Sequence, residues 1–235
     1  MNDSKLSSSQ IAYESIKEWI LSGFLPPGEK IDQDEVASKL NFSRMPVRSA
    51  LDRLSSEGLV MKIPHRGVVT SKLSDTELNQ IFELRAHVES MIGIQAARYA
   101  SESSIRRLYN ILQYHQDSPD VSMAAILEQN RAFHRMITLS TESDVLLKVF
   151  DIVWEQAERY RRIYYYSNRS NTRVIKEHRQ IADLIAAHRP QEVSDLIIQH
   201  TANSQKAILE LMNKPFSFTP FRTLYVEEND GKGNS

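Results

Sequence analysis

The sequence predicts a mainly α chain with two domains, an N-terminal winged helix-turn-helix and a C-terminal antiparallel bundle of six helices. Three observations support this prediction. Before residue 72, two short helix patterns separated by a tight break are followed by two β-rich runs. From residue 75 to about residue 212, apolar residues recur at the spacing of amphipathic helices. Only short polar or proline-marked breaks interrupt that spacing.

The amino-acid composition limits the classes of protein to which this chain can belong. A length of 235 residues suffices for two domains, and 41% hydrophobic with 25% charged residues is normal for a globular protein. The absence of cysteine excludes disulfides, thiolate metal sites and a cysteine nucleophile. No apolar run approaches the roughly 18 residues of a membrane span, and the polar start MNDSKLSSSQ is unlike a signal peptide. We therefore expect a cytoplasmic protein without a membrane partner.

The net charge of the chain does not indicate a nucleic-acid partner. The whole chain carries −1, and residues 1–72 contain ten Lys/Arg and nine Asp/Glu, a difference of +1. DNA affinity would therefore have to come from where the charges lie and not from their total.

The helix-turn-helix pattern lies in residues 31–70. Asp32-x-x-Glu35 has the form of a capping box that opens a short helix. Asn41 can end this helix in the left-handed conformation, and Ser43 is predicted to cap a second helix that Gly58 ends. The inner stripe of the second helix is Val47, Ala50, Leu51 and Leu54. Two β-rich runs around Pro64-His65-Arg66-Gly67 then predict a hairpin wing.

The exposed face of the second helix is basic. Arg44 and Arg48 lie four residues apart near its N-terminus, the part of a recognition helix that reaches base edges in the major groove. Arginine offers two donors to the acceptors of guanine. The wing adds positive charge, and Gly67 permits close approach of its backbone to DNA. The predicted DNA-binding residues are Ser43, Arg44, Arg48, Lys62, His65, Arg66 and Gly67. The alternatives are a solvated basic helix or a winged domain that binds only protein.

The first domain is predicted to span residues 1–72, with a helix at 10–22 that packs behind the DNA-binding unit. The second spans 73–213, and a tail at 214–235 is predicted to be extended or disordered. The six helices of the second domain are predicted near 75–100, 102–116, 121–140, 143–166, 171–188 and 190–213. Short loops between consecutive helices indicate an antiparallel bundle.

Three histidines and one asparagine interrupt inward apolar stripes of this bundle. Asn130 and His134 do so in one helix, His178 in the next to last and His200 in the last. A single inward histidine is usually a satisfied core residue. Three on separate helices are typical of a site for Zn²⁺, Ni²⁺, Cu²⁺ or Fe²⁺, because bundles build metal sites from facing helices.

Arg85 interrupts the apolar stripe of the helix at 75–100. A buried guanidinium is costly unless it is paired. Glu89, one turn later, is one possible partner. The other is the carboxylate of a ligand, which arginine binds through two parallel hydrogen bonds. The basic and aromatic run from Arg159 to Tyr166 is interpreted as packing and surface, without a role in a site.

The N-terminal domain resembles a known family through a dense, ordered run of residues. The run is Ile20-x-x-Gly23-x-Leu25-x-Pro27-Gly28 followed by Ser43-Arg44-x-Pro46-Val47-Arg48-x-Ala50-Leu51-x-x-Leu54-x-x-Glu57-Gly58-Leu59-Val60. It is similar to the DNA-binding domain of GntR-type bacterial transcription regulators. The resemblance implies that Arg44, Arg48 and Gly67 contact operator DNA. Some members carry a further DNA-contacting arginine at about the place of Asp34.

The second domain resembles the ligand-binding domain of the FadR subfamily, in its FCD form, through Asn130-x-x-Phe133-His134, Glu177-His178 and His200. Such domains often hold a divalent metal through an Asp or Asn and three histidines. The resemblance therefore implies Asn130, His134, His178 and His200 as ligands, with zinc as the expected metal and nickel or another transition metal as alternatives. Aspartate is more usual at the position of Asn130. These domains also commonly sense small carboxylates, which favours Arg85 as an effector-binding residue.

The predicted function is that of a DNA-binding transcription regulator and not of an enzyme. A homodimer on an inverted-repeat operator is expected, because a winged helix reads only a few base pairs. The resemblance implies a repressor whose DNA binding is modulated by a metal and a small carboxylate effector. Two alternatives remain: a metal-dependent hydrolase-like enzyme, for which no clear general base exists, and a metal-responsive regulator without an organic effector.

Overall fold

The computed structural model describes residues 6–114, 123–167 and 172–213. These residues are mainly α-helical and include a two-stranded sheet, so the predicted fold class is confirmed. They form two compact units that divide between Leu73 and Ser74, whereas the sequence placed the border after residue 72. The predicted tail at 214–235 lies outside the described residues.

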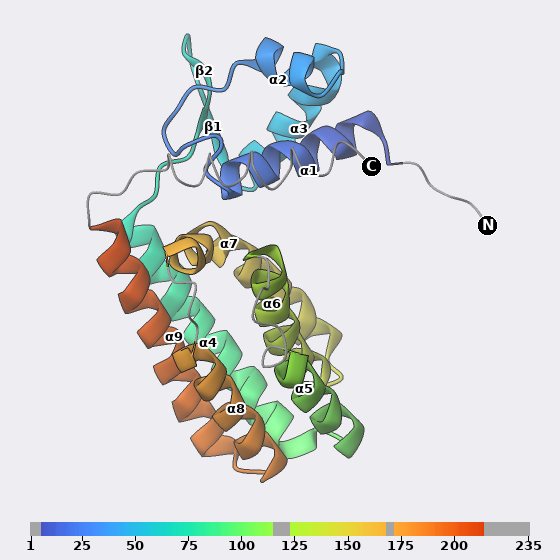
Figure 1. The fold of residues 1–235 in the computed structure, drawn as a ribbon, viewed down its shortest axis with the longest axis vertical. Coiled ribbons are helices and arrows are strands. Elements are labelled where there is room, and N and C mark those ends of the chain that lie inside the picture. Colours follow the sequence, from blue (N-terminus) through green and yellow to red (C-terminus); the bar gives the residue numbers. More distant parts are fainter. Residues whose placement is uncertain (1–5, 115–122, 168–171, 214–235) are drawn as a thin grey trace, which may run out of the picture. The chain divides into compact units, whose positions relative to one another are not determined.

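The N-terminal unit is a helix-turn-helix with a wing (Figure 1). Its elements are α1 (Ser8–Leu21), α2 (Gln33–Lys39), α3 (Arg44–Ser56), β1 (Val60–Ile63) and β2 (Gly67–Thr70). The Asp32 side chain accepts hydrogen bonds from the N–H groups of Asp34 and Glu35, which confirms the predicted cap of α2. Asn41 follows α2 with a φ of 54°, in the left-handed region. The strands of the wing pair antiparallel, with Ile63 opposite Gly67.

The core of this unit lies between α1 and α3. Its members are apolar residues that recur at helical spacing or lie in the wing: Ala12, Tyr13, Ile16, Val47, Ala50, Leu51, Leu54, Val60 and Val68. Helical periodicity in the sequence predicts that the inner stripe of α1 consists of Ile11, Ala12, Ile16, Trp19 and Ile20, but Ile11 is 39% exposed. The buried stripe of α1 follows Ala12 and Ile16, and Ile11 lies about 100° around the axis from Ala12.

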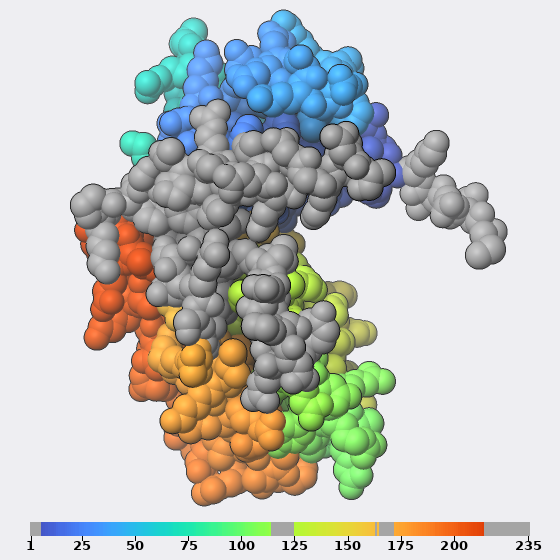
Figure 2. All heavy atoms as spheres, in the orientation of Figure 1, coloured from blue at the N-terminus to red at the C-terminus, as the bar shows by residue number. Residues whose placement is uncertain are grey.

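The second unit is a bundle of helices, as predicted. The helices are α4 (Asp75–Tyr99), α5 (Glu102–Tyr114), α6 (Met123–Leu139), α7 (Asp144–Ser167), α8 (Thr172–Ala186) and α9 (Pro190–Met212). Helices α4 and α9 run antiparallel and share the longest interface of the unit (Figure 1). Atoms of α5 and α8 form adjoining surfaces at one end of the bundle (Figure 2). Tyr109 joins these two helices by donating to Asp183 Oδ1 at 2.8 Å.

The end of α4 corrects one prediction. Helical periodicity in the sequence predicts Tyr99 on the same inner stripe as Arg85 and Ala96, but Tyr99 is 69% exposed. Ala96, Ala97 and Ala100 are buried in its place. The core at this end is narrow enough that small side chains fill it, and a tyrosine does not fit.

Gly93 explains how α4 and α9 approach so closely. A Cβ added at Gly93 would lie 2.7 Å from Cγ1 of Val193 and closer still to Cδ1 of Ile197. Both of these α9 side chains are buried. The contact between the two helices therefore depends on the absence of a side chain at this position.

We expect Gly93→Ala to lower the free energy of unfolding by about 1–3 kcal/mol, because overpacking a tight core costs that much. In an ordinary helix the same change stabilises by about 1 kcal/mol. Urea denaturation of the full-length protein measures the difference, with the exposed α4 substitution Gln80→Ala as control. A Gly93→Ala variant as stable as the wild type would show that α9 can move aside.

Candidate functional site

The predicted DNA-binding residues of α3 lie on its exposed face. Ser43, Arg44 and Arg48 are all exposed, opposite the buried stripe of this helix. Ser43 occupies the cap position of α3, but its side chain makes no capping hydrogen bond. The predicted N-cap position of Ser43 is therefore confirmed, but its hydroxyl does not accept a hydrogen bond from the N–H groups of the first turn. The hydroxyl remains exposed beside the N-terminus of α3, where helices attract phosphate.

The wing presents its four predicted residues to solvent as well. Lys62, His65, Arg66 and Gly67 are exposed. His65 and Gly67 have φ values of 62° and 85°, which the tight turn of the hairpin requires. A surface hollow of about 510 Å³ lies between α3 and the wing, and Arg48, Lys62 and His65 contribute to its lining.

Two of these cations have carboxylate partners. Arg44 makes a two-point ion pair with Asp34 of α2. Lys62 Nζ lies 2.5 Å from Asp52 Oδ1 of α3. Arg48, by contrast, has no ion pair with any residue that the structure describes. The predicted DNA-binding surface thus combines cations that are held in ion pairs, Arg44 and Lys62, with Arg48, which is not.

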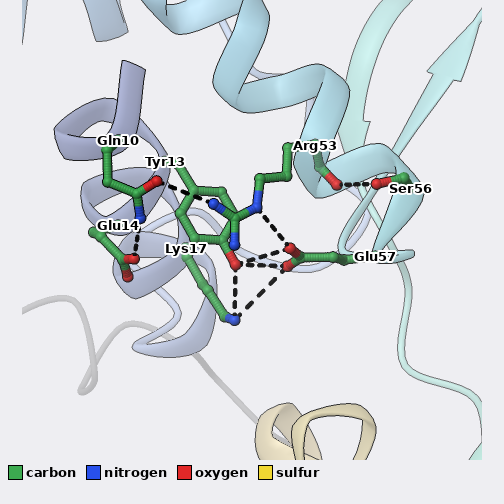
Figure 3. Close-up of polar contacts among 7 residues, drawn as sticks. All are labelled: Gln10, Tyr13, Glu14, Lys17, Arg53, Ser56 and Glu57. Atoms are coloured by element: carbon green, nitrogen blue, oxygen red, sulfur yellow. Dashed lines mark hydrogen bonds and ion pairs between the residues drawn. The ribbon is translucent and has the colours of Figure 1, made fainter. Parts of the chain in front are cut away.

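Behind this surface, a polar network fastens α3 to α1 (Figure 3). Tyr13 of α1 donates to the Glu57 carboxylate, 2.8 Å from Oε2, and Lys17 Nζ donates to the same hydroxyl at 3.0 Å. Arg53 Nε donates to Glu57 Oε1 at 3.1 Å, and its guanidinium lies 3.6 Å from the centroid of the Tyr13 ring. Since each residue has several partners, the network fixes the axial position of α3 against α1.

In the helical unit, three histidines from separate helices meet in the core. His134 of α6, His178 of α8 and His200 of α9 are all buried, and one nitrogen from each lies within 4.8 Å of the others. The ring centroids are 4.9 Å apart for His134 and His178, and 4.9 Å for His178 and His200. The structure therefore brings together three of the four residues of the predicted metal site through a common cluster of nitrogen atoms.

Carboxylates on neighbouring helices orient two of these imidazoles. His134 Nδ1 lies 2.7 Å from Glu89 Oε2 of α4. His200 Nδ1 lies 2.6 Å from Glu177 Oε2 of α8. Their Nδ1 atoms are thus engaged, which leaves Nε2 as the ring nitrogen available to a metal ion. His134 Nε2 is buried without a hydrogen-bond partner among the described residues, as expected of an atom that serves as a metal ligand.

The pKa values of groups in the cluster suit a role of its histidines as metal ligands. Burial lowers the pKa of His134 to about 4, against the opposing effect of Glu89, so its imidazole is neutral at neutral pH. Burial alone would raise the pKa of Glu177, but hydrogen bonds from His200 and Arg173 lower it to about 2. The pKa of Glu89 is likewise held well below its usual range by Arg85 and His134, which outweigh burial. A neutral imidazole whose second nitrogen contacts an ionised carboxylate, as in His134, is the form in which histidine binds metals.

A small cavity adjoins the histidines. Its volume is about 20 Å³, which is room for one water molecule or ion. The lining includes the fourth predicted ligand, Asn130, and the predicted effector residue, Arg85. The full lining is Arg85, Asn130, His134, Arg161, Tyr164, His200, Ser204 and Ile208.

Arg85 already has an internal partner. Its Nε donates to Glu89 Oε1 at 2.7 Å, which was one of the two alternatives for this residue. Its guanidinium also lies about 5 Å from the rings of Phe82 and Trp154, at 4.9 and 5.0 Å. Because Arg85 lines the cavity as well, the internal pair and a ligand role are compatible.

The sequence did not identify several members of this site. Arg161 and Tyr164 line the cavity, although the run that contains them was interpreted as packing and surface. Glu177 precedes His178 and points elsewhere on its own helix, yet it reaches His200 on α9. The available signal was Arg161, a buried arginine of α7 at helical spacing from Trp154. Arg161 lies 3.7 Å from the Trp154 ring.

Comparison with known proteins assigns both units. Residues 8–69 match the family model described as bacterial regulatory proteins, gntR family, and residues 80–203 match the FCD domain. The chain belongs to the GntR family. It carries the FCD domain of the FadR-like branch, as the sequence predicted.

Individual GntR-family proteins agree with this assignment. The Nta operon transcriptional regulator of Aminobacter aminovorans is 28% identical over 79% of this chain and 87% of its own length. The HTH-type transcriptional repressor GlaR of Escherichia coli is 26% identical, over 80% of this chain and 90% of its own. The solved structure of E. coli McbR/YncC shares the fold with a TM-score of 0.70, at 20% identity, covering 89% of this chain and all of that one.

These matches establish a transcription regulator. GntR-family regulators bind DNA, usually as dimers, and the matched family and relatives are regulators and not enzymes. The hydrolase alternative is thereby set aside. Within the described ranges, none of the helices combines the length and the apolar character that a membrane span requires.

We expect Arg48→Ala to weaken operator binding by about 1–3 kcal/mol, because it removes one bidentate base contact. Fluorescence anisotropy would measure the dissociation constant on an operator selected by the wild type from a random duplex pool. Arg106→Ala, which removes an exposed arginine of the helical unit, is the control. Equal affinities of Arg48→Ala and wild type would contradict the assignment of α3 as the recognition helix.

Proposed function

We propose that this regulator holds a divalent metal ion in its FCD domain through Asn130, His134, His178 and His200. The observation that carries the proposal is the cluster of three buried imidazoles, whose ligand atoms lie within 4.8 Å of one another. Glu89 and Glu177 support it, because carboxylates that orient metal-ligating histidines are a regular feature of metal sites. Imidazole with an amide oxygen suits zinc first, then nickel or another late transition metal.

The proposed ligand set is electrically neutral. When bound, a divalent ion supplies two positive charges that neither the imidazoles nor the Asn130 amide neutralises. Glu89 and Glu177 are ionised, but each is bonded to an arginine, Arg85 or Arg173. A small anionic ligand would therefore find the uncompensated charge of the metal ion at the cavity, where Arg85 and Arg161, paired with Glu89 and Glu158, supply guanidinium N–H donors.

We propose that a small carboxylate metabolite is the effector. Arginine binds carboxylates through paired hydrogen bonds, and both cavity arginines are almost fully buried, at 3% exposure. A cavity of about 20 Å³ is too small for an organic acid. Effector binding therefore requires side chains to move, and this requirement links occupancy of the site to conformation.

Helix α7 connects the cavity to the first residues of α4, where the helical unit begins. Arg161 and Tyr164 line the cavity, and Tyr160, in the same helix, reaches the start of α4. The Tyr160 hydroxyl donates to Glu77 Oε2 at 2.7 Å and accepts from the Ser74 N–H at 3.2 Å. Ser74 caps α4 directly after the division between the units. A shift of α7 would thus change the first turn of α4 and the constraint on the DNA-binding unit.

We further propose that the protein is a repressor that acts as a homodimer on an inverted-repeat operator. The similarity in sequence to GlaR, which is a transcriptional repressor, supports repression as the mode of regulation. A single winged helix contacts only a few base pairs, so two copies related by a two-fold axis supply the required specificity. Effector binding would alter operator affinity through the coupling between the two units.

One observation favours a second candidate, a regulator that responds to the metal alone. Arg85 is bonded to Glu89 at 2.7 Å, and the cavity has no volume for an organic ligand. In that case the metal ion would be the signal, and its removal would change DNA binding. The two candidates differ in whether any carboxylate binds the metal-loaded protein.

We expect the protein to bind one metal ion per chain with ligands that include His178. Elemental analysis of purified protein would show about one equivalent of metal, and His178→Ala would lose it. His87→Ala is the matched control, because His87 is exposed and lies outside the cluster. Full metal content in His178→Ala would exclude the proposed ligand set.

We expect a small carboxylate to stabilise the metal-loaded protein by about 2.7 kcal/mol at 100 times its dissociation constant. A thermal-shift panel of small carboxylates, sugar acids and amino acids would identify it. Arg85→Lys keeps a charge beside Glu89 but loses the planar fork, so it should lose most of the shift. Arg98→Lys, an exposed arginine of the same helix, should retain it.

The same panel separates the two candidates. A shift that chelation abolishes identifies a carboxylate sensor that depends on the metal. No shift with any carboxylate, combined with a loss of operator binding on chelation, supports the regulator that responds to metal alone.

A further inference from the structure

Asp34 is an acidic residue that contacts Arg44, one of the predicted DNA-binding residues. It lies in the first turn of α2, and its side chain is 59% exposed. Its backbone is fixed, because Asp32 Oδ1 accepts a hydrogen bond from the Asp34 N–H at 2.9 Å. The carboxylate reaches Arg44, the first residue of α3, whose side chain is 76% exposed.

The contact between these two side chains has a defined geometry. Asp34 Oδ2 accepts from Arg44 Nη2 at 2.6 Å, and Oδ1 pairs with Arg44 Nε. Asp34 thus occupies the Nε–Nη2 edge of the guanidinium. The remaining edge, formed by Nη1 and Nη2, keeps two N–H groups in a parallel arrangement that matches O6 and N7 of guanine.

Stability does not account for this pair. Exposed ion pairs contribute little to stability, and an acid in the first turn of a helix adds a similarly small amount through the helix dipole, so folding alone gives little reason for an acid beside the predicted DNA-binding residues. The carboxylate of Asp34 also lowers the affinity for DNA, because its negative charge is repelled by the DNA phosphates. A carboxylate at this position therefore needs a role that an uncharged residue would not perform.

We propose that Asp34 is a positioning residue that determines specificity by holding Arg44 as a reader of guanine. Asp34 restricts the guanidinium to one orientation and leaves only its base-reading edge free. Its negative charge keeps Arg44 from serving as a contact to any phosphate. This proposal rests on the DNA-binding role of α3 and deepens it.

Asp52 and Lys62 provide an internal comparison on the same surface. Lys62 Nζ contacts Asp52 Oδ1 at 2.5 Å, and both side chains are about half exposed, at 54% and 50%. Lysine is a point charge without a planar fork, so its pairing imposes no base-reading edge. Replacing either Asp34 or Asp52 by asparagine therefore removes one negative charge, but only Asp34 restrains an arginine.

The test uses the full-length, metal-loaded protein and two duplexes of equal length and composition. One is an operator selected from a random pool by the wild type, and the other is a scrambled sequence. Affinities are measured by fluorescence anisotropy over a range of salt concentrations. The variants are Asp34→Asn and Asp52→Asn, with thermal unfolding as the check that both fold.

For Asp34→Asn we expect the ratio of operator to scrambled affinity to fall about tenfold. The scrambled duplex should bind more tightly, because Arg44 becomes free to contact phosphate. The slope of log affinity against log salt on that duplex should steepen by about 0.9, the value for one additional neutralised phosphate. Asp52→Asn should tighten both duplexes by the same factor and leave the ratio unchanged.

A double variant tests whether Asp34 acts through Arg44. In an Arg44→Ala background, Asp34→Asn should no longer change the ratio of the two affinities. An unchanged ratio in the single variant, or an equal change with and without Arg44, would overturn the proposal. Failure of the wild type to enrich any sequence from the pool would instead overturn the DNA-binding role itself, and the role of Asp34 with it.

Discussion

The arrangement around the histidine cluster depends on the need to pair the ionisable groups buried beside it. Two chains of bonds meet this need in the same way. Arg85 bonds Glu89 four residues later on α4, and Glu89 contacts His134 on α6. Arg173 bonds Glu177 four residues later on α8, and Glu177 accepts from His200 on α9. Each chain joins guanidinium, carboxylate and imidazole, and together they tie four helices to one point.

The two chains differ in their contact with water. Arg85 is 3% exposed, whereas the Arg173 side chain is 40% exposed. Breaking the inner chain would leave a buried charge without a partner, which is strongly unfavourable. The outer chain can exchange its arginine for water at little cost. The two sides of the histidine cluster therefore have unequal freedom to rearrange, with the α8 side the more adaptable.

The sequence predicted which residues of a single helix face inward, but it missed side-chain contacts that depend on how two helices are placed against each other. The inward positions of His134, His178 and His200 follow from the periodicity of single helices, and so do the helices themselves. The contact from Glu177 to His200 does not, because the axial register of α8 against α9 decides it. The pair of Asp34 and Arg44 likewise joins two helices across a turn. Tyr99 was misplaced because periodicity does not record the width of the core, which at that end admits only alanines.

The position of Trp154 gives the protein an intrinsic optical reporter. The chain has two tryptophans, Trp19 in the DNA-binding unit and Trp154 beside the histidine cluster. The Trp154 ring lies 5.0 Å from that of His134 and beneath the guanidinium groups of Arg85 and Arg161. Indole emission responds to nearby charge and to paramagnetic ions. In a protein whose Trp19 is replaced by phenylalanine, the remaining fluorescence would therefore follow events in the core without any attached label.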